Sequence, residues 1–206
     1  MLGPYELNTI ITGDARELAK AIPDESIDLI LTDPPYPDYL TEEYQYSENG
    51  IDFLSRFNCR QFVFWSAKCP FPLDYTSIHI WDKKTGAGST YERIFERNGG
   101  AAYKVFRHYL INSEVAASYT RDIYTGHPSQ KPAALIREII EEYTRVGDII
   151  FDPFVGSGTT AAVCKALGRN YLAFEINPET AALARKRVEM TQPPLFVMQP
   201  IQDSLL

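Results

Sequence analysis

The sequence predicts an α/β fold in which a mostly parallel central sheet is covered by helices on both faces. Short apolar runs alternate with segments of helical periodicity along nearly the whole chain, which is typical of strands joined by crossover helices. Several apolar runs are continuous rather than alternating, as expected for strands that are buried on both faces. With 206 residues, 45% of them apolar and 23% charged, the chain can bury one core, and we expect one domain over residues 1–206.

The predicted elements follow from the apolar runs and from the residues that flank them. Strands are expected at 8–12, 27–32, 61–66, 77–81, 114–119, 148–151 and 171–174. Helices are expected at 15–21, 51–57, 133–144, 159–167 and 178–191. Asn177 before Pro178 is typical of a helix start, and Gly168 is typical of a helix end. Residues 83–112 show no clear periodicity and are predicted to be irregular and to face solvent.

The charges are unevenly spread along the chain. The net charge is −7, but residues 83–137 hold nine Lys or Arg against four Asp or Glu, which is +5 for this segment and −12 for the rest. A basic patch on an acidic body fits a polyanionic partner such as a nucleic acid. An accidental run of solvated charges is the alternative interpretation of this segment taken alone.

The sequence contains no recognisable targeting or metal-binding pattern. The N-terminus lacks a basic region followed by an apolar run, and no apolar stretch approaches the roughly 20 residues that span a bilayer. Cys59, Cys69 and Cys164 are far apart and form no C-x-x-C pair, so we expect buried free thiols and neither a metal site nor a disulfide. We therefore expect a cytoplasmic protein that makes no membrane contact.

A glycine-rich turn follows the predicted strand at 148–151. The sequence of this turn, residues 152–160, is DPFVGSGTT, and an alanine-rich helical segment comes next. Glycines let a backbone approach a ligand closely, and a helix N-terminus offers unpaired N–H groups to an anion. The next predicted strand runs to Glu175, 19 residues beyond Gly156, where nucleotide-binding folds place an acid that accepts hydrogen bonds from ribose hydroxyls. A tight strand-to-helix connection is the alternative for the turn alone, and a P-loop is disfavoured because no Gly-Lys-Ser/Thr follows.

A second candidate site follows the predicted strand at 27–32. This strand runs into Asp33-Pro34-Pro35-Tyr36, in which two prolines make the backbone stiff and extended. Such a segment holds a carboxylate, a carbonyl group and an aromatic ring rigidly at the end of a strand. A simple proline turn is the alternative interpretation of these four residues in isolation.

Together, the two motifs resemble those of the amino DNA methyltransferases, which transfer a methyl group from S-adenosylmethionine (SAM) to an exocyclic amino nitrogen of a base. The order of the motifs, with Asp33-Pro34-Pro35-Tyr36 before the glycine-rich turn, looks like that of the permuted beta group of this family. Further matches, which extend the resemblance over about residues 8–188, are Gly13-Asp14, Trp81-Asp82-Lys83 and His127-Pro128-Ser129-Gln130-Lys131-Pro132. The resemblance implies a Rossmann-like SAM-dependent methyltransferase fold with a circularly permuted motif order.

The resemblance also implies a role for each matching position. The residues expected to be catalytic are Asp33, Pro34, Pro35 and Tyr36, of which Asp33, Pro34 and Tyr36 are expected to hold the target base. The residues expected at the SAM site are Asp14, Asp33, His127, Lys131, Asp152, Phe154, Gly156, Ser157, Gly158, Thr159, Glu175 and Asn177. The Asp33 carboxylate and the Pro34 carbonyl can accept the two amino hydrogens and leave the nitrogen lone pair free, while Tyr36 can stack on a base taken out of the helix. For His127 and Lys131, a polar turn that opens a helix is the alternative interpretation.

The residue that precedes Pro-Pro-Tyr indicates which base is methylated. Family members with Asp at this position usually methylate adenine N6, whereas the cytosine-N4 group more often has Ser. We therefore expect adenine N6 of a flipped-out base as the acceptor, with cytosine N4, RNA or a protein glutamine as neighbouring possibilities. The alternative from another class is a catalytically silent SAM-fold protein that binds DNA or a partner. A nicotinamide dehydrogenase is disfavoured because the Gly-x-Gly-x-x-Gly spacing is absent.

Only about residues 84–125 are left for target recognition, which is shorter than the corresponding segment of many relatives. Contacts with double-stranded DNA are expected from Arg93, Arg97, Lys104, Arg107 and Arg121. Because a two-fold pair would extend a small binding face, we also expect a homodimer. Light scattering would reveal the mass of such a dimer.

Overall fold

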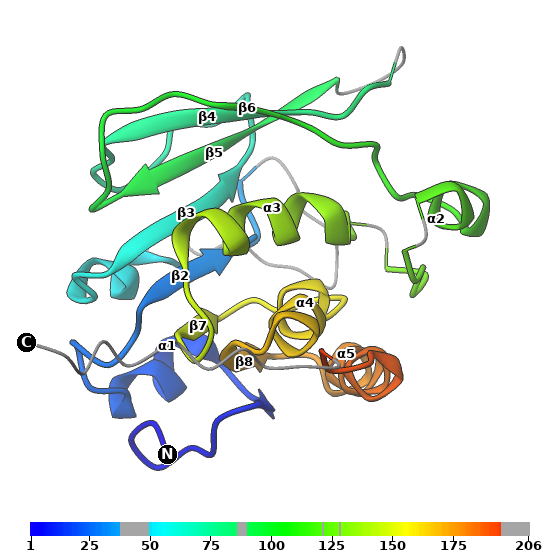
Figure 1. Ribbon diagram of the computed structural model, residues 1–206. Helices are drawn as coiled ribbons and strands as arrows, with labels where there is room; N and C mark the ends of the chain where they lie inside the picture. The colour runs from blue at the N-terminus through cyan, green and yellow to red at the C-terminus, as the bar shows by residue number, and fades with distance from the viewer. Residues whose placement is uncertain (38–49, 86–89, 121, 128, 195–206) are drawn as a thin grey trace, which may run out of the picture.

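Eight strands form one sheet in the order β1-β8-β7-β2-β3-β5-β4-β6 (Figure 1). The computed structural model describes residues 1–37, 50–85, 90–120, 122–127 and 129–194. The strands are β1 (Thr9–Thr12), β2 (Leu29–Thr32), β3 (Arg60–Trp65), β4 (Ser77–Asp82), β5 (Tyr91–Arg97), β6 (Val105–Arg107), β7 (Ile149–Asp152) and β8 (Asn170–Glu175). The run from β1 to β3 in this order is parallel throughout, whereas β5 is antiparallel to both of its neighbours. The prediction of a mostly parallel sheet is therefore confirmed.

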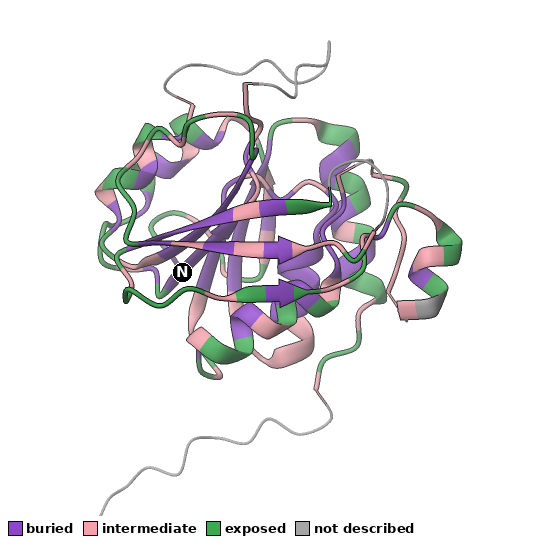
Figure 2. Cartoon of the chain, turned by 90° about the horizontal axis from the view of Figure 1, so that it is seen from above, coloured by how far each residue is buried: buried purple, intermediate pink, exposed green. Residues whose placement is uncertain are grey.

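Helices cover both faces of this sheet (Figure 1). They are α1 (Ala15–Leu18), α2 (Glu114–Thr120), α3 (Ala133–Tyr143), α4 (Thr159–Leu167) and α5 (Pro178–Met190), with the 3-10 helices η1 (Ala19–Ala21) and η2 (Asp52–Arg56). Consecutive residues of β2 enter opposite cores: Leu29 and Leu31 pack with α3, α4 and α5, whereas Ile30 packs with α1, η1 and η2. All residues of β2, and all but the first of β3, β7 and β8, are buried, as the continuous apolar runs predicted; in Figure 2 these strands lie behind the partly exposed strands nearest the viewer.

The predicted helix boundaries at 168 and 177 are confirmed. Gly168 has a φ of 69°, a left-handed conformation that glycine adopts at little cost, and it ends α4. The Asn177 side chain accepts hydrogen bonds from the N–H groups of Glu179 at 2.8 Å and Thr180 at 3.1 Å, and Pro178 opens α5. These caps fix the short connections between β8 and its two neighbouring helices.

Residues 114–119 form most of helix α2, so the strand predicted there is wrong. The Ser113 hydroxyl accepts a hydrogen bond from the Ala116 N–H at 3.2 Å, and the Ser113 carbonyl accepts one from Ala117 at 3.0 Å. This is the hydrogen bonding of a helix N-terminus, and it competes with pairing into a sheet. Val115 is 64% exposed, which means that the segment also lacks the burial that would favour a central strand.

The prediction of an irregular segment over residues 83–112 is also wrong, because the range contains β5 and β6. Three charged residues of β5, Glu92, Glu96 and Arg97, are buried, and their presence made the strand resemble a solvated surface in the sequence. β6 has three residues at the sheet edge and is too short for a periodic pattern. The partners that make burial of these charges tolerable come from other strands and loops, and sequence periodicity does not reveal them.

The cysteine thiols of the described residues are free. Cys164 is buried, whereas Cys59 and Cys69 are half-buried rather than fully buried as predicted. Burial raises the pKa of Cys59 to about 12, so this thiol stays protonated at neutral pH. Within the described ranges, no helix is long and apolar enough to cross a membrane, and no three His, Cys, Asp or Glu side chains are grouped so that they could hold a metal ion.

Candidate active site

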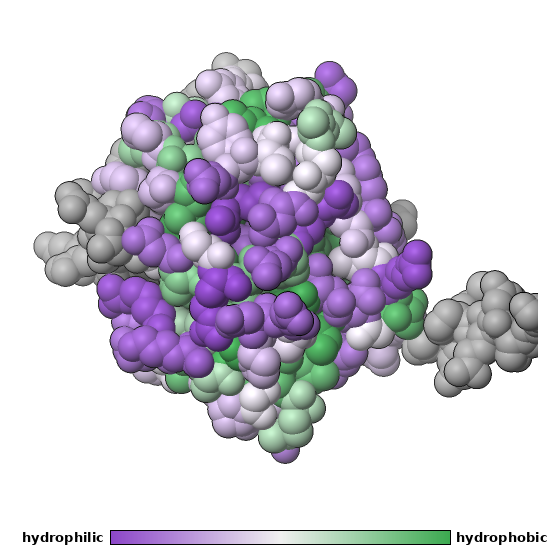
Figure 3. Space-filling view, turned by 90° about the vertical axis from the view of Figure 1, so that its left-hand side faces the viewer, coloured by the Kyte–Doolittle hydropathy of each residue, from purple (hydrophilic) through white to green (hydrophobic). Residues whose placement is uncertain are grey.

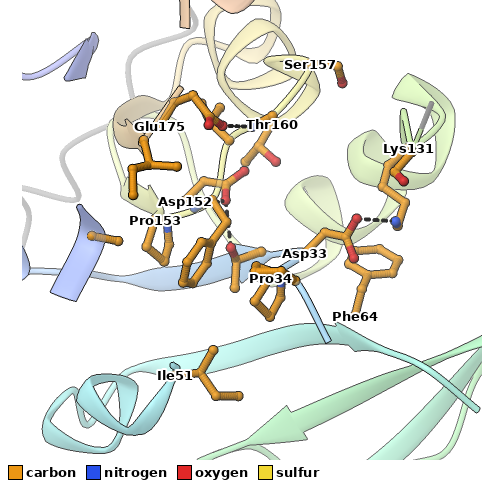
Figure 4. Close-up of a pocket in the computed structure, with 18 of the residues that line it drawn as sticks. Asp33, Pro34, Ile51, Phe64, Lys131, Asp152, Pro153, Ser157, Thr160 and Glu175 are labelled. Atoms are coloured by element: carbon orange, nitrogen blue, oxygen red, sulfur yellow. Dashed lines mark hydrogen bonds and ion pairs between the residues drawn. The ribbon is translucent and has the colours of Figure 1, made fainter. Parts of the chain in front are cut away.

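A pocket of about 540 Å³ opens at the carboxyl ends of the parallel strands (Figure 4). It lies where Asp33 follows β2, Asp152 ends β7 and Glu175 ends β8, the position at which open α/β sheets bind ligands. The predicted site residues that line it are Asp14, Asp33, Pro34, Pro35, Tyr36, His127, Lys131, Asp152, Phe154, Gly156, Ser157, Thr159 and Glu175. The fold thus brings the two sequence motifs, which are more than a hundred residues apart, to one cavity.

Two further predicted SAM residues, Gly158 and Asn177, lie outside the pocket lining. Gly158 has a φ of 78°, and a Cβ atom at this position would come within 2.8 Å of Ala184 Cα in α5. Asn177 caps α5 through its side chain, as described above. Both residues therefore determine how the loops after β7 and β8 meet, so the structure gives them a positioning role.

The carboxylate of Glu175 is held by two backbone amides. Its Oε2 accepts a hydrogen bond from the Gly156 N–H at 3.0 Å, and its Oε1 accepts one from the Asn177 N–H at 3.0 Å. The residue is only 5% exposed, yet it lines the pocket. A carboxylate offers about four acceptor positions, so these oxygens can also accept hydrogen bonds from the hydroxyls of a ligand.

Asp152 connects the two motifs. Its Oδ1 accepts hydrogen bonds from the Thr32 hydroxyl at 2.7 Å and from the Phe154 N–H at 3.2 Å. Burial raises the pKa of Asp152 to about 6, and the hydrogen bond from Thr32 counters part of this shift. Because Thr32 directly precedes Asp33, this contact fixes Asp33 relative to the glycine-rich turn (Figure 4).

Asp33 and Lys131 form an ion pair inside the pocket, next to the ring of Phe64 (Figure 4). Lys131 Nζ contacts Asp33 Oδ2 and lies 5.1 Å from the centroid of the Phe64 ring. The other oxygen, Asp33 Oδ1, is buried and has no hydrogen-bond partner within the part of the chain that the structure describes. An unsatisfied buried acceptor costs about 1–3 kcal/mol. A ligand that brings an N–H donor to Asp33 would recover this free energy.

Burial and neighbouring charges together set the ionisation of the pocket. Burial raises the pKa of Asp33 to about 6; Lys131 opposes this shift, and Glu92 adds to it. Burial alone would lower the pKa of Lys131, but the carboxylates of Asp33 and Glu92 outweigh it and raise this pKa. Burial and then the charge of Lys131 lower the pKa of His127. At neutral pH, therefore, Asp33 and Lys131 are ionised and His127 is neutral.

Glu92 of β5 is a second carboxylate at this site, and the sequence did not predict it. Its Oε1 lies 3.4 Å from Lys131 Nζ and 3.4 Å from the Tyr36 hydroxyl, and its Oε2 lies 3.1 Å from Lys83 Nζ. In the sequence, only the Trp81-Asp82-Lys83 match gave an indication of Glu92, because Lys83 is its ionic partner. Ile51 and Phe64 also line the pocket as apolar walls, and no motif in the sequence indicated them.

A buried ion pair between Arg187 of α5 and Asp122 ties the loops around the pocket together. The two groups are 2.7 Å apart, and Arg187 also donates to Thr159 Oγ1 at 2.6 Å. Asp122 in turn accepts a hydrogen bond from the N–H of Ala133, the first residue of α3, at 2.8 Å. The Thr159 hydroxyl donates to the Lys131 carbonyl at 3.1 Å. The segment that carries Lys131 and the start of α4 are therefore held as one unit.

Of the residues predicted to contact DNA, Arg97 is placed where it cannot do so. It pairs in register with Gln61 at the beginning of β3, on the sheet edge opposite the pocket, and it is 7% exposed. Its guanidinium donates to Gln61 Oε1 at 2.8 Å and to the Asp74 carbonyl at 2.7 Å. That edge of the sheet, largely hydrophilic in Figure 3, faces away from the pocket. Arg97 thus stabilises the sheet edge, and we remove it from the expected DNA contacts.

The remaining four candidates differ in their surroundings. Lys104 is bound to two carboxylates of α3 and lies 3.3 Å from the nearer oxygen of Glu138. Arg93 is half-buried and donates to the carbonyls of Ser66 and Cys69. The side chain of Arg107, at the end of β6, is 66% exposed on the same sheet edge as the pocket. Arg121 lies outside the described residues, as does Pro128 of the histidine-containing motif.

A smaller pocket of about 290 Å³ lies beside the first, where Pro132 and Ala133 follow Lys131. Its lining includes three cations, Lys84, Arg107 and Arg137. Tyr109, which is 54% exposed, also lines it, and Lys84 Nζ lies 4.4 Å from the centroid of the Tyr109 ring. Cations and an exposed ring on one edge are the side chains that bind phosphates and stacked bases.

The chain resembles known proteins both in sequence and in fold. Residues 58–186 match the family described as DNA methylase. The chain is 30% identical to the DNA adenine methyltransferase YhdJ of Escherichia coli K12, over 90% of its own length and 84% of that protein. The crystal structure of the M1.HpyAVI–SAM complex is similar with a TM-score of 0.63 at 22% identity, over 88% of this chain and 99% of that one. The cytosine-N4-specific PvuII DNA methyltransferase also has a TM-score of 0.63, at 19% identity, over 86% and 85% of the two chains.

Proposed function

The chain belongs to the DNA methylase family, and on this premise we propose that it transfers a methyl group from SAM to adenine N6 of a base flipped out of double-stranded DNA. The observation that carries the proposal is the buried Asp33 Oδ1, which heads the Asp-Pro-Pro-Tyr segment and lacks a donor among the described residues. An exocyclic amino group supplies that donor. Asp rather than Ser at this position favours adenine over cytosine.

The residues at the glycine-rich turn and at Glu175 fit a nucleoside cofactor. SAM, when bound, supplies a methyl group activated by the sulfonium charge. The N-terminus of α4 offers N–H groups and the positive end of the helix dipole to a carboxylate. Glu175, held by the amides of Gly156 and Asn177, is oriented to accept hydrogen bonds from ribose hydroxyls. The neutral ring of His127 packs within 3.5 Å of the position that a Cβ at Gly156 would take, which closes this end of the pocket.

The residues of the Asp-Pro-Pro-Tyr segment make the amino group reactive. Its nitrogen is a poor nucleophile because the lone pair is delocalised into the base. The Asp33 carboxylate and the Pro34 carbonyl accept its two hydrogens, which favours a pyramidal nitrogen with a localised lone pair. Tyr36 offers a ring for stacking, and an edge-to-face contact with Trp65, 5.8 Å between centroids, holds that ring in place. Fixed orientation of the reacting groups then contributes much of the rate acceleration.

Transfer to cytosine N4 is the second candidate function. It is favoured by the structural similarity to the cytosine-N4-specific PvuII enzyme, which equals the similarity to M1.HpyAVI in TM-score. The chemistry at Asp33 would be the same, because cytosine N4 is also an exocyclic amino nitrogen with a delocalised lone pair. Only identification of the product separates the two bases.

The test is to incubate the purified protein with labelled SAM and unmethylated duplex DNA of mixed sequence, and to identify the methylated nucleoside by mass spectrometry. We expect N6-methyladenine. Formation of N4-methylcytosine would retain the mechanism and replace the base. If SAM binds and no nucleoside of the DNA is methylated, the proposed substrate is wrong.

We propose that the DNA backbone follows the smaller pocket, along Lys84, Arg107 and Arg137. All three line that pocket beside the active site, and Arg107 is one of the residues that the sequence predicted. Their ionic partners are exposed acids: Arg107 lies 3.7 Å from Asp82, and Arg137 lies 3.3 Å from Glu141. Exposed pairs of this kind are weak, so a phosphate can replace the acid at little cost.

Replacing these three cations by glutamine is expected to weaken DNA binding and to flatten its dependence on salt. Each lost phosphate contact reduces the slope of log K against log salt concentration by about 0.9. Fluorescence anisotropy at several salt concentrations measures this slope. Lys104→Gln is the matched control, because Lys104 is bound to carboxylates of α3, and it should leave the slope unchanged. A steeper or equal slope in the triple variant would place the DNA elsewhere.

Homodimer formation and a cytoplasmic location stay predictions. A dimer would bring a second smaller pocket to the same DNA and lengthen the recognition face beyond what residues 84–125 offer. A monomer mass in light scattering at high protein concentration would contradict it.

A further inference from the structure

Glu92 is a buried charged group that the mechanism described so far does not use. It is 6% exposed and belongs to a cluster of two carboxylates, Asp33 and Glu92, and two ammonium groups, Lys83 and Lys131. The charges of this cluster balance. Buried ion pairs are nevertheless poor sources of stability, because removal of the charges from water offsets their attraction. Stability alone is therefore a poor reason for an acid at this position of β5.

Lys131 lies between the two carboxylates. Its Nζ contacts Asp33 Oδ2, and Glu92 Oε1 is 3.4 Å away. The rings of Phe64 and Trp81, at 5.1 Å and 5.9 Å from Nζ, flank the ammonium. A lysine has three donors on a flexible stem, so a small rotation can move its ammonium from one acid to the other while it stays against both rings.

Such a movement matters for methyl transfer, and the inference rests on the proposed function. With SAM bound, the pair of electrons in the bond between its sulfur and methyl carbon would stay on the sulfur of the departing thioether, and the lone pair of the amino nitrogen would form the new N–C bond. The nitrogen would then be positively charged until it released a proton to Asp33. An ammonium bound to the same carboxylate opposes that positive charge. We propose that Glu92 is a positioning residue that binds the Lys131 ammonium when the target amino group binds Asp33. Because Lys131 is then no longer paired with Asp33, Asp33 presents its full negative charge to the nitrogen.

Glu92→Gln keeps the shape of the side chain and removes the second carboxylate, so Lys131 stays on Asp33. We expect kcat to fall about 10- to 100-fold, while SAM binding measured by calorimetry is retained. Glu92→Asp keeps a carboxylate and should recover part of kcat. Because Glu92→Gln leaves two ammonium groups with one carboxylate, the charge-balanced variant Lys83→Met/Glu92→Gln is measured beside it and should show the same loss.

Glu96→Gln is the matched control. Glu96 lies on the same strand, is 2% exposed and pairs with His79 at 2.9 Å and Arg60 at 3.1 Å, but these contacts are at the end of β5 far from the pocket. This variant should lose thermal stability and keep kcat. Equal losses of kcat in Glu92→Gln and Glu96→Gln, or a wild-type kcat in the charge-balanced variant, would overturn the proposal.

The pKa of Asp33 gives a readout that needs no catalysis. Asp33 faces Lys131, Glu92 and Lys83, and its charge also acts on Asp152. Loss of the Glu92 charge should lower the pKa of Asp33, and Glu96→Gln should leave it in place. Carboxyl carbon NMR, assigned with Asp33→Asn, measures both. An unchanged pKa of Asp33 in Glu92→Gln contradicts the positioning role of Glu92. Failure of the wild-type protein to methylate DNA contradicts the proposed function alone.

Discussion

Replacing Asp33 by asparagine is expected to lower kcat for methyl transfer about 10²- to 10³-fold, the effect of removing one preorganised polar group from a reacting centre. Asparagine has the same shape, but it lacks the charge that stabilises the developing positive nitrogen. It also presents an NH₂ group either to Lys131 or to the target amino group, where an acceptor is needed. SAM binding should fall far less than kcat, because Glu175 and the glycine-rich turn are untouched. Single-turnover kinetics with saturating DNA measures the loss.

Asp28→Asn is the matched control for this substitution. Asp28 immediately precedes β2, at the end far from Asp33, and its Oδ2 accepts a hydrogen bond from the Ile149 N–H at 2.7 Å. The variant loses charge on the same segment of chain without touching the pocket. A loss of kcat as large as that of Asp33→Asn would mean that the effect of Asp33 is structural rather than chemical.

The activity should also decline as the pH falls through about 6. The pKa of Asp33 is raised to about 6, with burial as the largest cause, so the carboxyl is protonated below this pH and can no longer accept the amino hydrogens. The acid limb of kcat/KM should therefore lie near pH 6, well above that of an exposed aspartate. The residual activity of Asp33→Asn should lack this limb. If the limb persists, Asp152, whose pKa is also raised to about 6, is its source.

The sequence predicted the parallel half of the sheet and most of the pocket because both rest on local patterns. Continuous apolar runs mark strands that are buried on both faces, and the residues that follow such strands meet at one edge. Asp33 and Glu175 accordingly lie at one edge of the sheet, in the lining of one pocket. The pairing of Asp33 with Lys131 could not be placed in this way, because it depends on how a loop 98 residues away folds back over β2.

Two of the errors, the missed strand β5 and the DNA contact assigned to Arg97, share one physical origin, which is the burial of charge. β5 was missed since its glutamates looked like surface residues, and Glu92 was missed with it. Arg97 was taken for a DNA contact because a charged arginine in a basic segment is usually exposed. In the fold, each of these charges has a partner from another part of the chain: Lys83, which follows β4, for Glu92, and Gln61 of β3 for Arg97. Pairing across strands is a property of the tertiary structure, so neither composition nor periodicity could reveal it.

Arg187→Met is expected to lower the free energy of unfolding by about 3 kcal/mol, the lower end of the range for breaking a buried ion pair. The side chains of Arg187 and Asp122 are 2% and 6% exposed, so Asp122 would be left as a buried, uncompensated charge. The lower end applies because Asp122 also accepts backbone hydrogen bonds from Ile123 and Ala133, which offset part of the cost. Urea unfolding followed by circular dichroism measures the change.

The same substitution should weaken SAM binding, because Arg187 joins α5 to the loops of the pocket through Thr159. Arg185→Met is the matched control: Arg185 is half-buried on the same helix, and its donors reach Ile10 and Thr12 on β1, outside the pocket lining. This control should lower the free energy of unfolding by less than about 1 kcal/mol and leave SAM affinity unchanged.

The double variant Asp122→Asn/Arg187→Met also removes the unpaired charge of Asp122, and it should regain stability without regaining SAM affinity. If affinity returned together with stability, the loops would be held by the general stability of the fold, and the specific tie between α5 and the SAM pocket would be refuted.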